Sequence, residues 1–356
     1  MPVLRFLARS VASTLAGIAI ALVLTSCATP PTDTTDASSP TPNLVWPEPP
    51  EKPRVQFVRS VGKPEDLGFS KNIFTRVFEA IFGGPQEQLV RPMAVVDTGD
   101  VLFVADPGVR GVHRFDRKAG DYTLLRQRDD QALLSPVGMA LGEGGAVYVT
   151  DSALKVVFVI KPGAEFAEPL ALTEPLKQPT GIAYDAATKR LFVTDTGAHT
   201  IVVLDQSGKQ LAKIGERGEQ PGQFNYPTYT WLDTKGRLFV TDSLNFRTQI
   251  IDTRPDTLGK VLGAFGTMGD NRGEAPRQKG IALDSFGHVY VTDSLLSAIQ
   301  IFSDSGQFLL PIGGLGQGIG EFWLPAGIFI GKDDTIYVAD AYNQRIQVFR
   351  YIGGPT

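Results

Sequence analysis

Six near-copies of one five-residue phrase constrain the fold of this chain more than any other feature. Each copy has two apolar or aromatic residues, then Val, a small residue and Asp, as in "LFVAD" and "VYVTD". A fixed period of this length is typical of repeat architectures, in which each unit packs against its neighbours. The copies end at Asp106, Asp151, Asp195, Asp242, Asp293 and Asp340, at spacings of 45, 44, 47, 51 and 47 residues.

Each unit contains four short apolar stretches separated by turn residues. The first begins with Pro-x-Gly, as at Pro136 and Pro179; the second is the marker phrase; the third and fourth resemble residues 298–306 and 308–316. No long amphipathic helix connects them, which argues against a parallel α/β fold. Four alternating strands per unit of about 45 residues predict four-stranded antiparallel blades. We therefore predict an all-β, six-bladed β-propeller.

The turns after the marker phrase carry a family resemblance. They read "DTGAHTIVVLD" (195–205), "DSLNFRTQIID" (242–252) and "DAYNQRIQVFR" (340–350). These phrases resemble the NHL repeat over roughly residues 89–352, within the superfamily that includes the TolB-like propellers. The resemblance implies the propeller fold. It does not define the function, because propellers of this kind serve many roles.

The sixth unit lacks its fourth strand, and residues 55–62 match the missing piece. "VQFVRSVG" repeats the spacing of Phe, an apolar residue and Gly found in residues 308–313. An open ring would leave bare sheet edges, so the last blade must meet the first. We predict that this N-terminal strand pairs with Arg345–Arg350 and closes a propeller of residues 54–352.

Residues 68–84 stand outside the repeat and predict an accessory helix over about 70–82. Ser70 is a candidate N-cap and Gly83 a candidate C-terminal stop. The helix either packs on the propeller or docks a partner or a membrane. Its apolar residues lie three and four apart, at Ile73, Phe74, Val77, Phe78 and Ile81.

The first 27 residues resemble a bacterial lipoprotein signal. Arg5 and Arg9 precede an apolar run from Val11 to Leu24, and small residues lead to Cys27, the only cysteine. The resemblance implies cleavage after residue 26 and acylation of Cys27, which would anchor the chain to the bacterial cell envelope, in the outer membrane because Ala28 follows. The alternative is an ordinary secretory signal followed by an unrelated cysteine.

Residues 27–53 are rich in Thr, Pro and Ser and predict a tether. Trp46 is the one residue in it expected to dock on the propeller or to stay exposed. Removing residues 1–26 removes Arg5 and Arg9 and no acid, so the net charge changes from -4 to -6. No run of Lys and Arg is present, so we expect no nucleic-acid partner.

Residues repeated in every unit are most simply structural, since each blade needs them. The six Asp residues are therefore expected to accept backbone N–H bonds in turns, with Arg247 and Arg345 pairing with theirs. The middle residues of the Pro-x-Gly strands should line the central channel, and they are mostly apolar. They are Val95, Met139, Ile182, Thr230, Ile281 and Ile328.

A binding site requires residues that break the repeat, and blades four to six supply them. Tyr229 replaces Gly, Trp231 and Phe329 replace Ala, and Lys279 and Arg277 add charge. These five residues predict an aromatic and basic patch at one side of the channel mouth, overhung by residues 266–280. Two aromatic residues in the turns after the marker strands should share that face, where exposed apolar tips favour a protein contact. They are Phe246 and Tyr342.

The sequence favours a binding protein over an enzyme. Propeller lactonases hold calcium with inward carboxylates and amides, and the six channel positions contain none. His113, His199 and His288 fall at unlike positions of three blades. We therefore predict no catalytic residue, cofactor or metal, and a non-enzymatic scaffold that binds an envelope protein or small ligand. The alternatives are a propeller hydrolase or lyase with its site at the channel mouth, and a TolB-like role in envelope assembly.

Overall fold

The computed structural model describes residues 43–69 and 87–354. Its compact unit begins at Thr41 and contains the whole repeat region. The predicted signal peptide of residues 1–26, Cys27 and the predicted helix of residues 70–82 lie outside the described residues. In the part described, the only helices are 3-10 turns, and none is long and apolar enough to cross a membrane.

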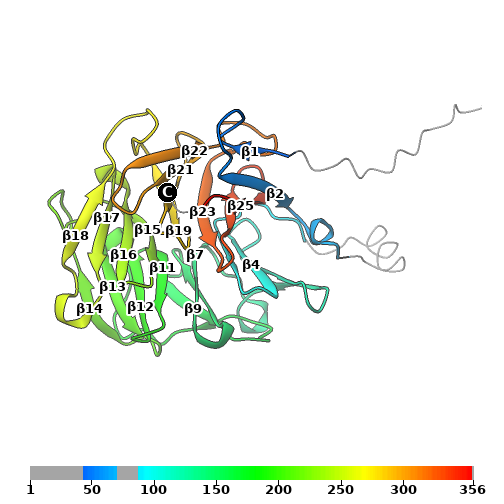
Figure 1. Ribbon diagram of the computed structural model, residues 1–356. Helices are drawn as coiled ribbons and strands as arrows, with labels where there is room; N and C mark the ends of the chain where they lie inside the picture. The colour runs from blue at the N-terminus through cyan, green and yellow to red at the C-terminus, as the bar shows by residue number, and fades with distance from the viewer. Residues whose placement is uncertain (1–42, 70–86, 355–356) are drawn as a thin grey trace, which may run out of the picture. The chain divides into compact units, whose positions relative to one another are not determined.

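The strands form six sheets arranged in a ring (Figure 1), which confirms the predicted all-β propeller. Blade 1 contains β3 (Ala94–Asp97), β4 (Val101–Asp106), β5 (Gly111–Asp116) and β6 (Asp121–Leu125). Blade 2 contains β7 (Pro136–Leu141), β8 (Val147–Asp151), β9 (Val156–Ile160) and β10 (Glu168–Pro169). Blade 3 contains β11 (Pro179–Asp185), β12 (Arg190–Asp195), β13 (Thr200–Asp205) and β14 (Gln210–Ile214).

The other three blades follow the same plan. Blade 4 contains β15 (Pro227–Leu232), β16 (Arg237–Asp242), β17 (Arg247–Asp252) and β18 (Val261–Phe265). Blade 5 contains β19 (Gln278–Leu283), β20 (Val289–Asp293), β21 (Ala298–Phe302) and β22 (Phe308–Ile312). Blade 6 contains β23 (Pro325–Ile330), β24 (Thr335–Asp340), β25 (Arg345–Tyr351), β2 (Val55–Val61) and β1 (Val45–Trp46).

The short 3-10 turns lie in connections between strands. They are η1 (Pro64–Leu67), η2 (Arg128–Asp130), η3 (Glu143–Gly145), η4 (Thr196–Ala198), η5 (Ser243–Asn245) and η6 (Pro255–Thr257). Two of them, η4 and η5, directly follow the marker Asp of blades 3 and 4, and each is followed by a residue in the left-handed conformation, His199 or Phe246. This geometry reverses the chain tightly after the marker strand.

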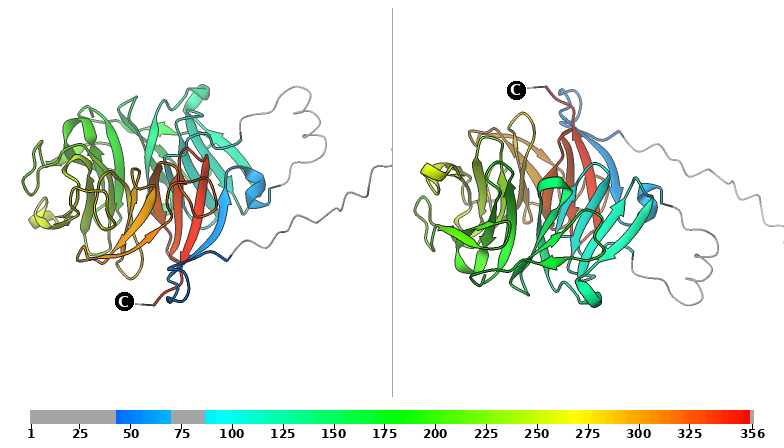
Figure 2. Two further views of the ribbon diagram at one scale, coloured as in Figure 1. Left: turned by 90° about the horizontal axis from the view of Figure 1, so that it is seen from above. Right: turned by 90° about the horizontal axis from the view of Figure 1, so that it is seen from below.

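The N-terminal strand closes the ring as predicted. In β2, Val55 pairs with Tyr351 and Val61 pairs with Ile346, in the antiparallel orientation. Figure 2 shows this strand in blue beside the red strands of blade 6 in both views. The closure joins the two ends of the repeat region and removes the open edge between the last blade and the first.

The folded region starts earlier than the predicted boundary at residue 54. Val45 and Trp46 form β1, a fifth strand of blade 6 paired with β2, so Trp46 is docked and not exposed. The Pro-rich composition around it concealed this strand. Trp46 and Leu44 pack against the cluster that contains Phe349. The free energy gained by this burial offsets the conformational entropy that the segment loses when it becomes ordered.

Close approach of neighbouring inner strands explains the Gly of the Pro-x-Gly phrase. A Cβ at Gly181 would lie 2.7 Å from the carbonyl oxygen of Thr228 in the next blade. A Cβ at Gly280 would lie 2.6 Å from the carbonyl oxygen of Ala326. Only Gly fits at these positions without moving the backbone. The blades therefore meet tightly at the centre, and the apolar clusters fill the space between them farther out.

The inner strands all start at the same end of the ring, beside the marker Asp residues. Antiparallel pairing places Pro136 opposite Asp151 and Pro325 opposite Asp340. We call this end of the ring the Asp face, and the end that carries the turns between the first two strands of each blade the opposite face. The turns that follow the marker strands and the segments that enter the inner strands lie on the Asp face.

Candidate functional site

The six marker Asp carboxylates hold the segment that enters each blade against the turn that follows the marker strand. Asp106 is fully buried and accepts hydrogen bonds from the N–H groups of Val90 and Gly108, each at 2.7 Å. Asp151 accepts from Ser135 N at 2.9 Å and Leu154 N at 2.9 Å. This confirms their predicted structural role.

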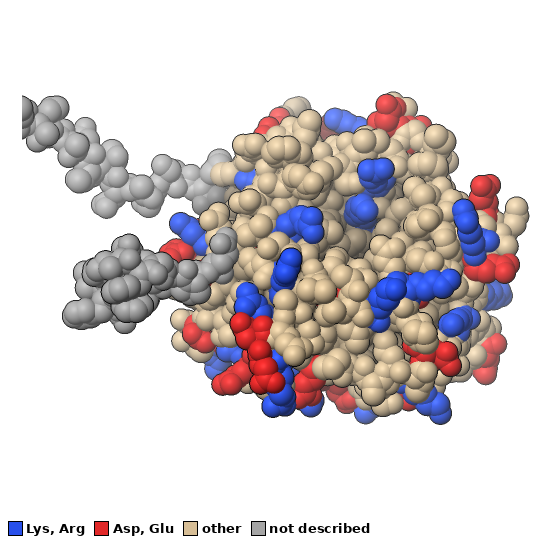
Figure 3. Space-filling view, turned by 180° about the vertical axis from the view of Figure 1, so that it is seen from behind, with Lys and Arg blue, Asp and Glu red and all other residues tan. Residues whose placement is uncertain are grey.

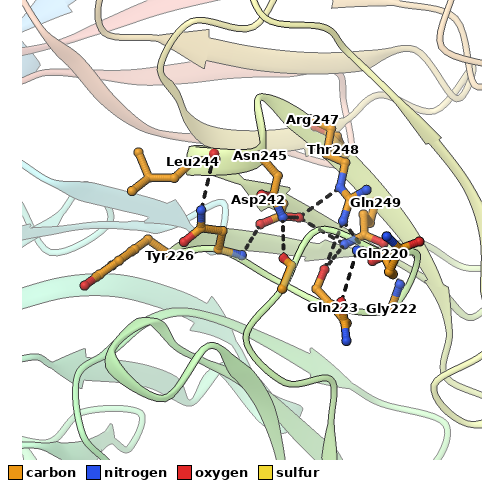
Figure 4. A network of polar contacts seen from close by, with 12 residues as sticks. Gln220, Gly222, Gln223, Tyr226, Asp242, Leu244, Asn245, Arg247, Thr248 and Gln249 are labelled. Carbon is orange, nitrogen blue, oxygen red and sulfur yellow. Dashed lines mark hydrogen bonds and ion pairs between the residues drawn. The ribbon is translucent and has the colours of Figure 1, made fainter.

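Blades 4 and 6 extend this arrangement with side-chain donors, as Figure 4 shows for Asp242. Its carboxylate accepts from Asn225 N at 2.6 Å, Asn245 Nδ2 at 2.8 Å, Arg247 Nε at 3.0 Å and Gln249 Nε2 at 3.1 Å. Asp340 is bonded in the same way by Asn343, Arg345 and Gln347. The pairing of Arg247 and Arg345 with their Asp residues is confirmed.

The central channel contains a mainly apolar cavity of about 190 Å³. Its lining includes all six positions predicted for the channel, from Val95 in blade 1 to Ile328 in blade 6. Tyr229 borders it as well. Its hydroxyl donates to the carbonyl oxygens of Met93 at 3.0 Å and Val137 at 3.2 Å, in blades 1 and 2. The ring of Tyr229 therefore crosses the channel, and burial raises the pKa of its phenol.

Trp231 and Phe329 lie toward the opposite face. Each is the fifth residue of its inner strand, β15 or β23, and their ring centroids are 5.8 Å apart. Both line the central cavity and a second, larger cleft beside it. The sequence predicted that these aromatic residues come together, and the structure places them in contact.

Lys279 and Arg277 lie at the other end of the channel, which corrects the predicted single patch. Lys279 is the second residue of β19 and Arg277 precedes that strand, so both belong to the Asp face. The ring of Tyr229 crosses the channel between these cations and the Trp231–Phe329 pair. The positions of Lys279, Trp231 and Phe329 in their inner strands, second against fifth, were a usable signal for this separation. The sequence could not show that the Tyr229 ring crosses between them, because that depends on the direction in which the side chain leaves its strand.

Lys279 is a half-buried cation that has no partner among the described residues. In the described part of the chain, its ammonium group makes no hydrogen bond or ion pair. Burial lowers the pKa of this amine, and the nearby charge of Arg277 lowers it further. An anion in the channel mouth would relieve both effects.

Other unpaired cations surround the channel mouth. The Asp face carries Lys and Arg residues that form no ion pair with any residue in 43–69 or 87–354, among them Arg91, Arg110, Lys155, Lys177, Arg217, Arg277 and Lys279. On the opposite face several cations are paired, as in Arg237–Asp233 at 2.7 Å and Lys189–Glu143 at 3.1 Å, and others such as Lys332 have no ion pair among the described residues. Figure 3 shows the Asp face, with Lys and Arg side chains around its central hollow and most Asp and Glu side chains toward the rim. The mouth is therefore basic although the whole chain is acidic.

Exposed apolar side chains lie next to this basic mouth in blades 4 to 6. Leu244, Leu295 and Tyr342 each stand two residues after their marker Asp and are 46%, 61% and 53% exposed. Tyr226 and Trp323 precede the inner strands of blades 4 and 6 and are also exposed. Tyr342 was predicted at this face. Leu244 and Leu295 were missed, although their shared spacing from the marker Asp was a usable signal.

Phe246 differs from the other predicted tips. It ends the turn after Asp242 in the left-handed conformation, with φ 54°. Phe246 is partly buried, whereas Leu244 is exposed, so Phe246 presents the smaller fraction of its surface to solvent. The predicted overhang of residues 266–280 includes Met268, which is 75% exposed.

Comparisons with known proteins agree with this architecture. A family model described as DUF5128, 6-bladed beta-propeller, matches residues 282–353. Peptidyl-glycine alpha-amidating monooxygenase B of Xenopus laevis is 27% identical over 245 residues, which is 64% of this chain and 27% of the relative. The mouse relative is 26% identical over 64% of this chain and 24% of its own length. The chain is a six-bladed β-propeller with NHL-type repeats.

Solved structures support the fold alone. Virginiamycin B lyase from Staphylococcus aureus aligns over 74% of this chain and 96% of its own, with 16% identity and a TM-score of 0.54. A putative gluconolactonase aligns over 74% and 89%, with 13% identity and a TM-score of 0.56. The NHL-type propeller spans about a quarter of the length of the curated monooxygenase relatives, so their activity is not transferred to it.

The three histidines of the propeller lie in separate environments. His113 Nδ1 is 2.9 Å from the hydroxyl of Tyr122, and His288 Nδ1 is 2.7 Å from Asp284 Oδ2. His199 Nδ1 accepts a hydrogen bond from Tyr226 N at 3.1 Å, and burial lowers the pKa of its imidazole, with a smaller contribution from the charge of Arg217. Within the described residues, no three His, Cys, Asp or Glu side chains are grouped to hold a metal ion.

Proposed function

We propose that this propeller is a lipid-anchored binding module of the bacterial cell envelope whose Asp face docks an acidic protein partner. Its role is to hold that partner, without catalysis. The lipobox-like sequence that ends at Cys27 supports the anchor, and the Pro-rich stretch after it supplies a tether. The rest of the proposal depends on the surface of the Asp face.

The apolar tips of blades 4 to 6 carry the proposal. Leu244, Leu295 and Tyr342 repeat one position in three neighbouring blades, so they form a contiguous group on one face. Tyr342 also packs on Trp323, with ring centroids 5.6 Å apart. Exposed aromatic and aliphatic side chains grouped beside charged residues are typical of protein interfaces, where they supply the contacts that determine affinity.

The charge of the channel mouth defines the partner. Cations that lack an ion pair in the described residues retain their full attraction for an external anion, whereas a paired cation such as Arg237 is partly neutralised by its neighbours. Lys279 stands deepest, so an acidic side chain that reaches it would be partly removed from water, where its charge interaction is strongest. An acidic partner with apolar residues matches both parts of the surface.

Paired triple variants test the proposal. A triple variant should lower recovery of the cross-linked partner from membranes at least tenfold. It combines Leu244→Ser, Leu295→Ser and Tyr342→Ser. The matched control is Leu211→Ser, Leu262→Ser and Leu309→Ser, three leucines of comparable exposure on the outer strands, which should leave recovery unchanged. Equal recovery with both variants would contradict the proposal.

The charge of the partner is tested separately. Binding of the identified partner should weaken with Lys279→Glu and with rising salt, since screening reduces attraction between exposed charges. Single-stranded RNA should not compete for the site. Competition by RNA, or binding that is indifferent to salt, would show that the acidic-protein assignment is wrong.

A further inference from the structure

The opposite face carries a cleft that the proposed function does not use. It lies between blades 6 and 1, which are side by side in both views of Figure 2. Its volume is about 870 Å³, within the range of small-molecule pockets. It shares Leu141, Trp231 and Phe329 with the central cavity, so the two spaces adjoin at the aromatic pair.

The central cavity forms an apolar extension of this cleft. Tyr229 crosses the channel on the Asp side and is fixed by hydrogen bonds to Met93 and Val137. The cavity beyond it is lined by Val95, Met139, Ile182, Ile281 and Ile328. A narrow apolar space that adjoins a wider cleft fits the end of an extended hydrocarbon chain better than a polar ligand, since a polar group there would lose its hydrogen bonds to water.

The wall of the cleft holds a fixed polar group. Arg117 donates to Asp97 Oδ2 at 3.0 Å and to the carbonyl oxygen of Gly99 at 2.7 Å. Tyr337 of blade 6 donates to the same Asp97, so this cluster joins blade 6 to blade 1. Burial raises the pKa of the Tyr337 phenol, as does its hydrogen bond to Asp97, and it remains a neutral donor. The carboxylate of Asp97 is therefore already satisfied within the protein.

The remaining charges of the cleft are mainly positive. Four cations line the whole cleft: Arg59, Arg117, Lys332 and Arg350. Two carboxylates line it, Asp97 and Asp333, so the net charge of the lining is 4 − 2 = +2. Arg59 and Lys332 are exposed and form no ion pair within residues 43–69 and 87–354. The pair between Arg350 and Asp333 is long, at 4.0 Å, and both side chains are more than half exposed. The rim therefore favours an anionic group.

We propose that the cleft and the central cavity together bind a long-chain carboxylate. Its hydrocarbon chain lies between Trp231 and the apolar channel lining, and its carboxylate contacts Arg59 and Lys332 at the rim. This site is separate from the Asp face and does not depend on the docking of a protein partner there. It gives the propeller a second ligand, of a different chemical class.

Titration with dodecanoate, below its micellar concentration, tests this site on the full folded chain. Calorimetry should show saturable binding, and the fluorescence of Trp231 should change with the same dissociation constant. Dodecanol should bind more weakly because it lacks the charge, and acetate should not bind because it lacks the chain. Absence of saturable dodecanoate binding, or equal binding of acetate, would overturn the proposal.

Variants separate the two parts of the site. Arg59→Glu with Lys332→Glu should raise the dissociation constant of dodecanoate at least tenfold and leave that of dodecanol unchanged. The matched control, Lys155→Glu with Lys177→Glu, makes the same change of charge with exposed residues of the Asp face and should have no effect. Met139→Phe should weaken both ligands by filling the cavity. If the control variant weakened dodecanoate equally, the binding would be an effect of net charge and the site assignment would fail.

Discussion

The indole of Trp46 packs edge-on against the ring of Phe349, with centroids 5.6 Å apart and the ring planes inclined by 69°. Trp46 belongs to β1 and Phe349 to β25, near the two ends of the folded unit. The indole also covers Gly320, where a Cβ would lie 2.7 Å from the indole ring. One side chain therefore joins the N-terminal segment, the last blade and the segment that leads into its inner strand.

Trp46→Ala should destabilise the propeller because it removes this packing. We expect a loss of about 2 kcal/mol in the free energy of unfolding, below the value for a fully buried aromatic residue, since Trp46 is half-buried. Urea unfolding measures it. Trp323→Ala is the control: Trp323 is 40% exposed at the Asp face, and its replacement should change stability by less than about 0.5 kcal/mol.

Tyr229→Phe should also destabilise the protein, through the channel. The phenol hydroxyl bonds two carbonyl oxygens of other blades, and its removal leaves these acceptors with one partner fewer. The expected cost is about 1 kcal/mol. Tyr342→Phe removes a hydroxyl for which no hydrogen bond is found in the described part of the chain, so it should be neutral. Equal effects of the two changes would show that the channel hydrogen bonds contribute nothing.

The repeated features were predictable because six copies report on the same environment. The spacing of the marker Asp residues predicted the blades, and the match between residues 55–62 and 308–313 predicted that β2 pairs with β25. The channel positions followed from their shared place in the inner strand. In each case the backbone determines the position, and a pattern of strands and turns is sufficient to find it.

The unique features were less predictable because they depend on side-chain direction and on distant neighbours. Tyr229 was recognised as a departure from Gly, but its sequence position does not show that the ring crosses to Met93 and separates Lys279 from Trp231. Lys279 and Arg277 were predicted at the channel mouth, but the other cations around it were not, because they come from several blades and form no run in the sequence. The β1 strand was hidden by the prolines around it.

Asp242→Ala tests the polar network of blade 4. The buried carboxylate receives four hydrogen bonds, and its removal leaves Arg247, 18% exposed, without its ion pair. Breaking a buried pair from one side costs about 3 kcal/mol in the free energy of unfolding. Asp304→Ala breaks exposed pairs with Lys235 and Arg237 and should cost less than about 1 kcal/mol. A small effect at Asp242 would mean that water replaces the carboxylate.

Cys27→Ser tests the predicted membrane anchor. The unmodified protein should incorporate labelled fatty acid and sediment with membranes, because several acyl chains on one residue give stable attachment. The Ser variant should lose the label and appear in the soluble fraction. Its folded unit begins after this residue, so its thermal unfolding should be unchanged. Label that persists in the Ser variant would exclude Cys27 as the site of acylation.

Lys279 predicts how stability changes with pH. The pKa of its amine is lowered in the folded state, so the unfolded chain binds the proton more tightly. At neutral pH the buried charge therefore opposes folding, and this cost disappears as pH rises through the folded-state pKa toward the ordinary value near 10.5. Lys279→Met should accordingly be more stable than the unmodified protein at pH 7, and the difference should narrow at alkaline pH. Lys155→Met, at an exposed lysine of the same face, serves as the control and should show no such narrowing. Urea unfolding of the three proteins between pH 7 and 10.5 measures this. A stability difference independent of pH would show that Lys279 affects stability through packing and that burial of its charge does not destabilise the folded state.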